Sequence, residues 1–134
     1  METNIIERKA RGFAGLIANV IEPLNNNPKF KEQFRRKKRK YLINASNLNY
    51  AALITLDKGT LIIEGVRNKP ISNLEKNLLG WDSYVSIDSQ IFLALIMNKI
   101  SLLNIILKWL IRRVKIKGLI KIFTLLKMLN FLKD

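Results

Sequence analysis

The chain has 134 residues, a formal net charge of +14, no cysteine and no histidine. The length predicts a single domain over residues 1–134. The composition excludes disulfides, thiolate nucleophiles, zinc–thiolate sites and any catalytic arrangement with a histidine base, so we expect a binding protein, not an enzyme, with no cofactor and no metal site.

Residues 1–40 are predicted to form a helical, basic N-terminal segment. Residues 5–24 carry apolar side chains at spacings of three, four and seven, which is typical of one helix face; these are Ile6, Phe13, Leu16, Ile17, Val20 and Leu24. Pro23 and Asn25–Asn27 end this helix. Asn27 followed by Pro28 predicts the start of a short second helix, which runs into a basic block. The charges in the first twelve residues argue against a signal peptide, so we expect a cytoplasmic protein.

Residues 41–134 are predicted to hold the sheet and the apolar helices. Apolar residues recur at every second position over residues 41–45, 52–57 and 61–66. The turn signal Asp57-Lys58-Gly59 separates the last two of these segments. This pattern predicts a three-stranded antiparallel meander. A polar segment with one helical turn around residues 74–79 follows, and Gly80 then leads into a strand over residues 81–87.

The last third of the chain is apolar and basic. Asp88 is a predicted N-cap for a helix from Ile91, and a second apolar run ends at Arg112. Neither run gives eighteen uncharged apolar residues, so no membrane-spanning helix is expected. Residues 114–118 alternate as a short strand, and residues 119–132 predict a helix about 21 Å long. Its polar residues spiral around the axis, so the helix is apolar on most sides and requires burial on several of them.

Basic residues are concentrated in two regions. Arg35–Lys40 reads RRKKRK, and residues 89–133 contain nine basic residues and no acidic one. Such a field favours a polyanion, either an anionic membrane surface or nucleic acid. The alternative interpretation is that the charge keeps an apolar domain soluble.

The order of these segments resembles the sterol carrier protein 2 sterol-binding domain family over about residues 10–132. The matching pieces are the meander (YLINAS, YAALITL, GTLIIEGV), the capped strand end Ile87-Asp88, the turn Asn98-Lys99-Ile100 and the basic strand Val114–Gly118. The resemblance implies an α+β fold with a five-stranded, mostly antiparallel sheet and helices packed on one face. It also implies non-catalytic binding of a fatty-acyl chain, a sterol or another lipid in an apolar tunnel between sheet and helices.

We therefore predict a lipid-binding site in the C-terminal third of the chain. Its candidate apolar residues are Phe92, Ile96, Leu103, Ile106, Leu107, Trp109, Leu110, Phe123, Leu126 and Met128. The candidate residues for an anionic headgroup, or for peripheral contact with an anionic membrane, are Arg112, Arg113, Arg35, Arg36, Lys37 and Lys38. For each apolar residue, ordinary core packing is the alternative interpretation.

Three other functions stay open at this stage. The basic block would suit a nucleic-acid binder, although no aromatic residues interleave with it for stacking and Tyr41 is the only aromatic neighbour after it. A homodimer would cover the C-terminal helices without any ligand. Catalysis by a carboxylate pair is disfavoured, because Asp82 and Asp88 lie about 20 Å apart along one strand.

Overall fold

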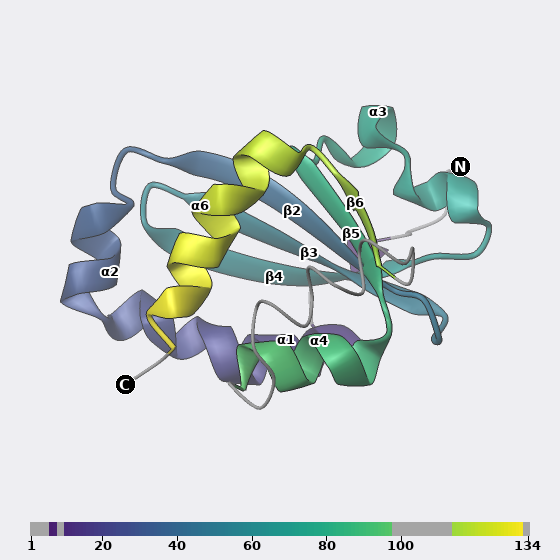
Figure 1. The fold of residues 1–134 in the computed structure, drawn as a ribbon, viewed down its shortest axis with the longest axis horizontal. Coiled ribbons are helices and arrows are strands. Elements are labelled where there is room, and N and C mark those ends of the chain that lie inside the picture. The colour runs from purple at the N-terminus through teal and green to yellow at the C-terminus, as the bar shows by residue number, and fades with distance from the viewer. Residues whose placement is uncertain (1–5, 8–9, 98–113, 133–134) are drawn as a thin grey trace.

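The computed structural model describes residues 6–7, 10–97 and 114–132 and shows a mixed sheet packed against helices, which makes the fold α+β (Figure 1). The described strands follow the order β1-β4-β3-β2-β5-β6 across the sheet. Among these described strands only β2 and β5 pair in parallel, and the other neighbours are antiparallel. The strands are β1 (Ile6–Glu7), β2 (Lys38–Ala45), β3 (Tyr50–Asp57), β4 (Thr60–Arg67), β5 (Ser83–Ile87) and β6 (Lys115–Lys117).

Strands β2, β3 and β4 form the predicted meander. Asp57 pairs with Thr60, so the turn between β3 and β4 has two residues, Lys58 and Gly59, with φ angles of 51° and 87°. Two positive φ angles in a two-residue loop match the right-handed twist of the strands on either side. The turn signal in the sequence therefore fixes the register of this hairpin.

The helical elements begin where the sequence places their caps. The Asn27 side chain accepts the N–H groups of Lys29 and Phe30 at 3.0 and 3.1 Å, and the Asp88 carboxylate accepts those of Gln90 and Ile91 at 2.8 and 3.3 Å. Both predicted caps are confirmed. The elements are α1 (Gly12–Ile21), η1 (Glu22–Asn26), α2 (Pro28–Gln33), η2 (Ile71–Leu74), α3 (Lys76–Leu79), α4 (Ser89–Ile96) and α6 (Leu119–Asn130).

The N-terminal region differs from the helical segment predicted for residues 1–40. Ile6 lies opposite Val66 and adds a short sixth strand at the β4 edge, while α1 begins only at Gly12. The basic block is also not helical at its end, because β2 already begins at Lys38. Pairing of Lys38 with Asp57 extends the β2–β3 ladder into the block, and this tertiary pairing overrides the local sequence preference.

The sheet is covered on both faces, whereas the resemblance implied helices on one face. The face packed against α1, α4 and α6, here called the inner face, carries side chains such as Tyr41, Ile43 and Ile54. Residues between them point to the opposite, outer face, where Leu42 and Leu53 pack against the η2–α3 segment and Trp81. Side chains alternate along a strand, so burial on both sides produces the continuous buried run 41–45 in β2.

The N-terminal end of α6 is held firmly against β2 and β5. Gly118 has φ of 73°, and a Cβ at this position would collide with the Asp82 carbonyl oxygen, so only glycine fits. The Ser83 hydroxyl donates to the Gly118 carbonyl at 2.7 Å, and the Tyr41 hydroxyl donates to the Lys121 carbonyl at 3.2 Å. From this anchor α6 runs across the sheet toward α2 (Figure 1).

Candidate functional site

The predicted lipid-binding residues fall into three groups. Phe92, Ile96 and Met128 are buried in the layer between the inner face and the helices. Leu126 is half-buried, and Phe123 is 58% exposed. Leu103, Ile106, Leu107, Trp109 and Leu110 lie outside the described residues.

The three buried residues converge from two helices on one apolar layer. The Phe92 ring on α4 meets the Phe13 ring on α1 edge-on, with 6.2 Å between ring centroids. Ile96 and Met128 belong to the same core cluster, which also contains Ile87 at the end of β5. The fold therefore brings these predicted residues together where the resemblance places a tunnel, and their contacts in the structure are those of a packed core.

Helix α6 carries apolar side chains on two opposite sides. Ile122, Leu125 and Met128 are buried against the core, whereas Ile120 is 85% and Phe123 is 58% exposed. The sequence predicted this excess of apolar helix surface. In the described part of the chain, its outward side is turned to solvent.

The candidate anion-binding residues of the basic block are all exposed. Arg35 lies 3.3 Å from the Glu32 carboxylate, and Arg36, Lys37 and Lys38 form no ion pair with another described residue. Arg112 and Arg113 lie outside the described residues.

Aromatic packing brings the basic block to α6. The ring of Phe34, the residue just before the block, lies 6.0 Å from the ring of Phe131, and the Phe30 ring lies 5.4 Å from it. Phe131 immediately follows α6. The start of the basic block therefore lies beside the C-terminal end of this helix.

Tyr41 has a pKa that is shifted by burial. Burial raises the pKa of its phenol to about 12, and a hydrogen bond to Thr124 opposes this shift in part. The phenol is therefore neutral at physiological pH and acts as a fixed hydrogen-bond donor beneath α6.

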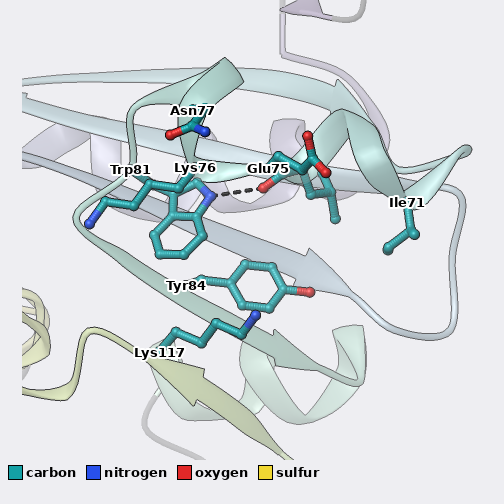
Figure 2. Close-up of a pocket in the computed structure, with 8 residues that line it drawn as sticks. Ile71, Glu75, Lys76, Asn77, Trp81, Tyr84 and Lys117 are labelled. Carbon is teal, nitrogen blue, oxygen red and sulfur yellow. Dashed lines mark hydrogen bonds between the residues drawn. The ribbon is translucent and has the colours of Figure 1, made fainter.

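A groove on the outer face is the feature that the sequence did not reveal. It is open, has a volume of about 450 Å³ and lies between the η2–α3 segment and strands β5 and β6 (Figure 2). Its lining residues are Ile71, Leu74, Glu75, Lys76, Asn77, Trp81, Tyr84 and Lys117.

Two aromatic rings and two lysines define the chemistry of this groove. The Trp81 and Tyr84 rings are tilted by 32° with centroids 5.5 Å apart, and the Trp81 indole N–H donates to the Leu74 carbonyl at 2.8 Å. The Lys76 ammonium lies 5.7 Å from the Trp81 ring, and that of Lys117 lies 5.9 Å from the Tyr84 ring. Such distances are those of cation–π contacts.

The pairing of β5 with β6 explains why the sequence did not reveal the groove. Tyr84 pairs with Lys117, which is 33 positions further along the chain. The alternation of residues 114–118 predicted that one face of this strand is exposed to solvent. No local signal in the sequence indicates which other strand pairs with it.

Comparison with known proteins gives no assignment. No family model matches the chain, and no curated protein matches its sequence. Within the described ranges, no helix has the length and hydrophobicity needed to cross a membrane. The functional interpretation therefore depends on the residues themselves.

Proposed function

We propose that this chain is a non-catalytic lipid-binding domain that holds an acyl chain, a sterol-like molecule or another apolar ligand between sheet and helices. One observation carries the proposal, namely that α6 buries one apolar side in the core and also exposes two apolar side chains, Ile120 and Phe123, on the opposite side. Exposed apolar surface on a charged domain is typical of a contact with lipid or with a protein partner.

The charge around α6 favours lipid as that contact. Lys121 and Lys127 are exposed on the helix, and the ring of Phe34, which directly precedes the basic block, contacts Phe131 at the C-terminal end of the helix. Basic residues close to an anionic membrane contribute about 1 kcal/mol each. An apolar strip among lysines matches the boundary between acyl chains and anionic headgroups, so the carrier would meet a membrane through this side.

We further propose that the fold is of the sterol carrier protein 2 type. Three described features support it: the meander, the Asp88 cap after β5 and the alternating strand β6 directly before α6. In that arrangement the ligand would lie against Phe92, Ile96 and Met128. Each methylene moved from water into such a layer contributes about 0.8 kcal/mol. The roles of residues 103–113 and the cytoplasmic location stay predictions.

Lipid extraction from the purified protein tests the proposal. We expect native mass spectrometry to show a bound mass that solvent extraction recovers as lipid. The purified protein should also take up a fluorescent fatty acid. A ligand-free mass together with no uptake would contradict a carrier.

A matched pair of variants on α6 locates the site. Leu126 and Leu129 are both half-buried on this helix; Leu126 was predicted to line the site, but Leu129 is the one that packs against the core cluster of Phe92, Ile96 and Met128. Leu129→Gln should therefore weaken fatty-acid uptake more than Leu126→Gln, while circular dichroism confirms that both variants fold. Equal uptake by the two variants would place the ligand elsewhere.

A homodimer through the exposed side of α6 is the competing interpretation. Light scattering after gel filtration measures the mass in solution. A lipid-free dimer that Phe123→Ser converts to monomer would replace the carrier proposal with an interaction module.

A further inference from the structure

We propose that the outer-face groove binds a nucleotide, either free or as one unit of a single-stranded nucleic acid. The planar base would lie against Tyr84, and the phosphate would lie at Lys117. The groove is separate from the proposed lipid site, because the whole thickness of the sheet lies between the two.

The shape of the groove suits a ligand of this size. Small-molecule sites usually measure about 300–1,000 Å³, and this groove measures about 450 Å³. One wall is the η2–α3 segment, and the floor is formed by Tyr84 of β5 and Lys117 of β6 (Figure 2). Because the groove is open, a longer strand could continue beyond it over the sheet.

The aromatic floor is preorganised. Trp81 is 8% exposed and is fixed by its hydrogen bond to Leu74, so it supports the Tyr84 ring from one side. Tyr84 is half-buried and has no hydrogen bond from its hydroxyl to any residue in the described part of the chain. A ring held in this way loses little conformational freedom when a base stacks on it.

Lysines from both basic regions of the sequence reach this face. Lys117 and Lys115 pair with Tyr84 and Ser86, so their side chains share the outer face with those residues. Lys40, from the basic block, lies on the same side of β2 as Leu42. The block has few aromatic neighbours along the sequence, but the fold supplies Tyr84 and Trp81 from another segment.

The acidic residues near the groove do not neutralise the charge of Lys117. The Asp82 carboxylate is already engaged, since it accepts the Lys40 N–H at 2.8 Å and lies 3.3 Å from the Lys121 ammonium. Glu75 lines the opposite wall together with Asn77 (Figure 2). The negative charge of Glu75 repels a phosphate and so favours its position at Lys117. The side chains of Glu75 and Asn77 can both hydrogen-bond to the edge of a base. Lys117 on the floor is therefore the contact proposed for the phosphate, and Glu75 and Asn77 on the wall are those proposed for the base, while Lys76 beside the Trp81 ring is a second cation.

Binding of a fluorescein-labelled short oligoadenylate, followed by anisotropy across a salt series, tests this site. Tyr84→Leu removes the stacking ring and should weaken binding about 5- to 150-fold. Lys117→Gln should weaken binding and lower the salt slope by about one. Lys115→Gln is the matched control, because it removes the same charge from the same face of the same strand without lining the groove. Its effect should be smaller than that of Lys117→Gln.

Nuclear magnetic resonance with adenosine monophosphate distinguishes a free nucleotide from a strand. Shifts confined to residues 74–77, 81, 84 and 117 support the site, and saturation by the mononucleotide alone identifies a free nucleotide as sufficient. Shifts that fall on α6 instead would overturn the proposal, and so would their complete absence together with no oligoadenylate binding.

Two further outcomes count against the site. Equal losses from Lys117→Gln and Lys115→Gln, with Tyr84→Leu unchanged, would mean non-specific charge. Displacement of oligoadenylate by anionic vesicles, with no nucleotide shifts in the groove, would mean a membrane surface. If circular dichroism shows that Tyr84→Leu does not fold, the site is tested by the comparison of Lys117→Gln with Lys115→Gln and by the resonance shifts with adenosine monophosphate. The lipid proposal is tested separately, by fatty-acid uptake and by vesicle binding of the α6 variants.

Discussion

Removal of the two exposed apolar side chains of α6 should detach the protein from membranes. Complete burial of an isoleucine or phenylalanine side chain is worth about 1.5–3 kcal/mol. Ile120 is 85% and Phe123 is 58% exposed in the free protein, so insertion of these exposed portions into lipid contributes about 2–4 kcal/mol in total. The double change Ile120→Ser with Phe123→Ser should therefore weaken binding by roughly 30- to 1,000-fold.

Cosedimentation with vesicles of phosphatidylcholine and phosphatidylserine measures this loss. The matched control is Ile62→Ser with Leu78→Ser, which removes apolar side chains that are 48% and 57% exposed. Ile62 lies on the outer face and Leu78 on the α3 segment that covers it, so this control should bind vesicles like the unaltered protein. Both double variants should keep nearly the original melting temperature, because exposed side chains contribute little to folding.

The result that would refute this reasoning is equal vesicle binding by the two double variants. Binding that vanishes at high salt in both would mean that charge alone attracts the protein to lipid. In that case the apolar side of α6 would have to face something other than a membrane.

Three further predictions concern the framework that holds α6 and α4. Gly118→Ala should destabilise the fold by more than the roughly 1–2 kcal/mol of a left-handed backbone. Gly80→Ala, with φ of 71° and open space around the new methyl group, should cost only that amount in urea unfolding. Tyr41→Phe loses the hydrogen bond to Lys121 and should cost about 0.5–1.5 kcal/mol near neutral pH. The raised pKa of Tyr41 also means that the folded state binds its proton more tightly, so stability present below pH 10 is lost as the pH rises toward about 12. This loss should be absent in Tyr41→Phe. Asp88→Ala removes the cap of α4 and should cost about 1 kcal/mol in the same assay.

Each of these predictions has a clear contrary outcome. Equal costs for the two glycine variants would mean that the space around Gly118 is less restricted than its contacts indicate. A parallel decline of Tyr41→Phe and the unaltered protein above pH 10 would assign the alkaline loss to lysines. An unchanged unfolding midpoint for Asp88→Ala would mean that the cap contributes nothing to α4.

Local features of the fold could be predicted from the sequence. The meander follows from period-two alternation and from the Lys58–Gly59 turn, because both signals act between neighbouring residues. The caps Asn27 and Asp88 are equally local, since each side chain accepts N–H groups two and three residues further on. The excess apolar surface of α6 could also be predicted from the sequence, because it depends only on the angular positions of the residues around the helix axis.

Long-range pairing could not be predicted. The strand at Ile6 forms only because β4 offers a free edge at Val66, and Lys38–Lys40 become strand only because β3 extends beside them. The candidate groove depends on the register of Tyr84 with Lys117 and on placement of the η2–α3 segment over the outer face. Each of these depends on which strands become neighbours, and residue periodicity carries no information about that choice.

The central position of β2 has a consequence for synthesis of the chain. The Asn44 amide reaches the Ser86 hydroxyl of β5 at 3.1 Å, across 42 positions of sequence. While the ribosome is still adding those residues, a completed meander presents one side of β2 without a partner. Such an edge is a template for pairing with other chains. We therefore expect a nascent or truncated chain that stops after β4 to associate with itself or to require a chaperone, until β5 occupies the gap.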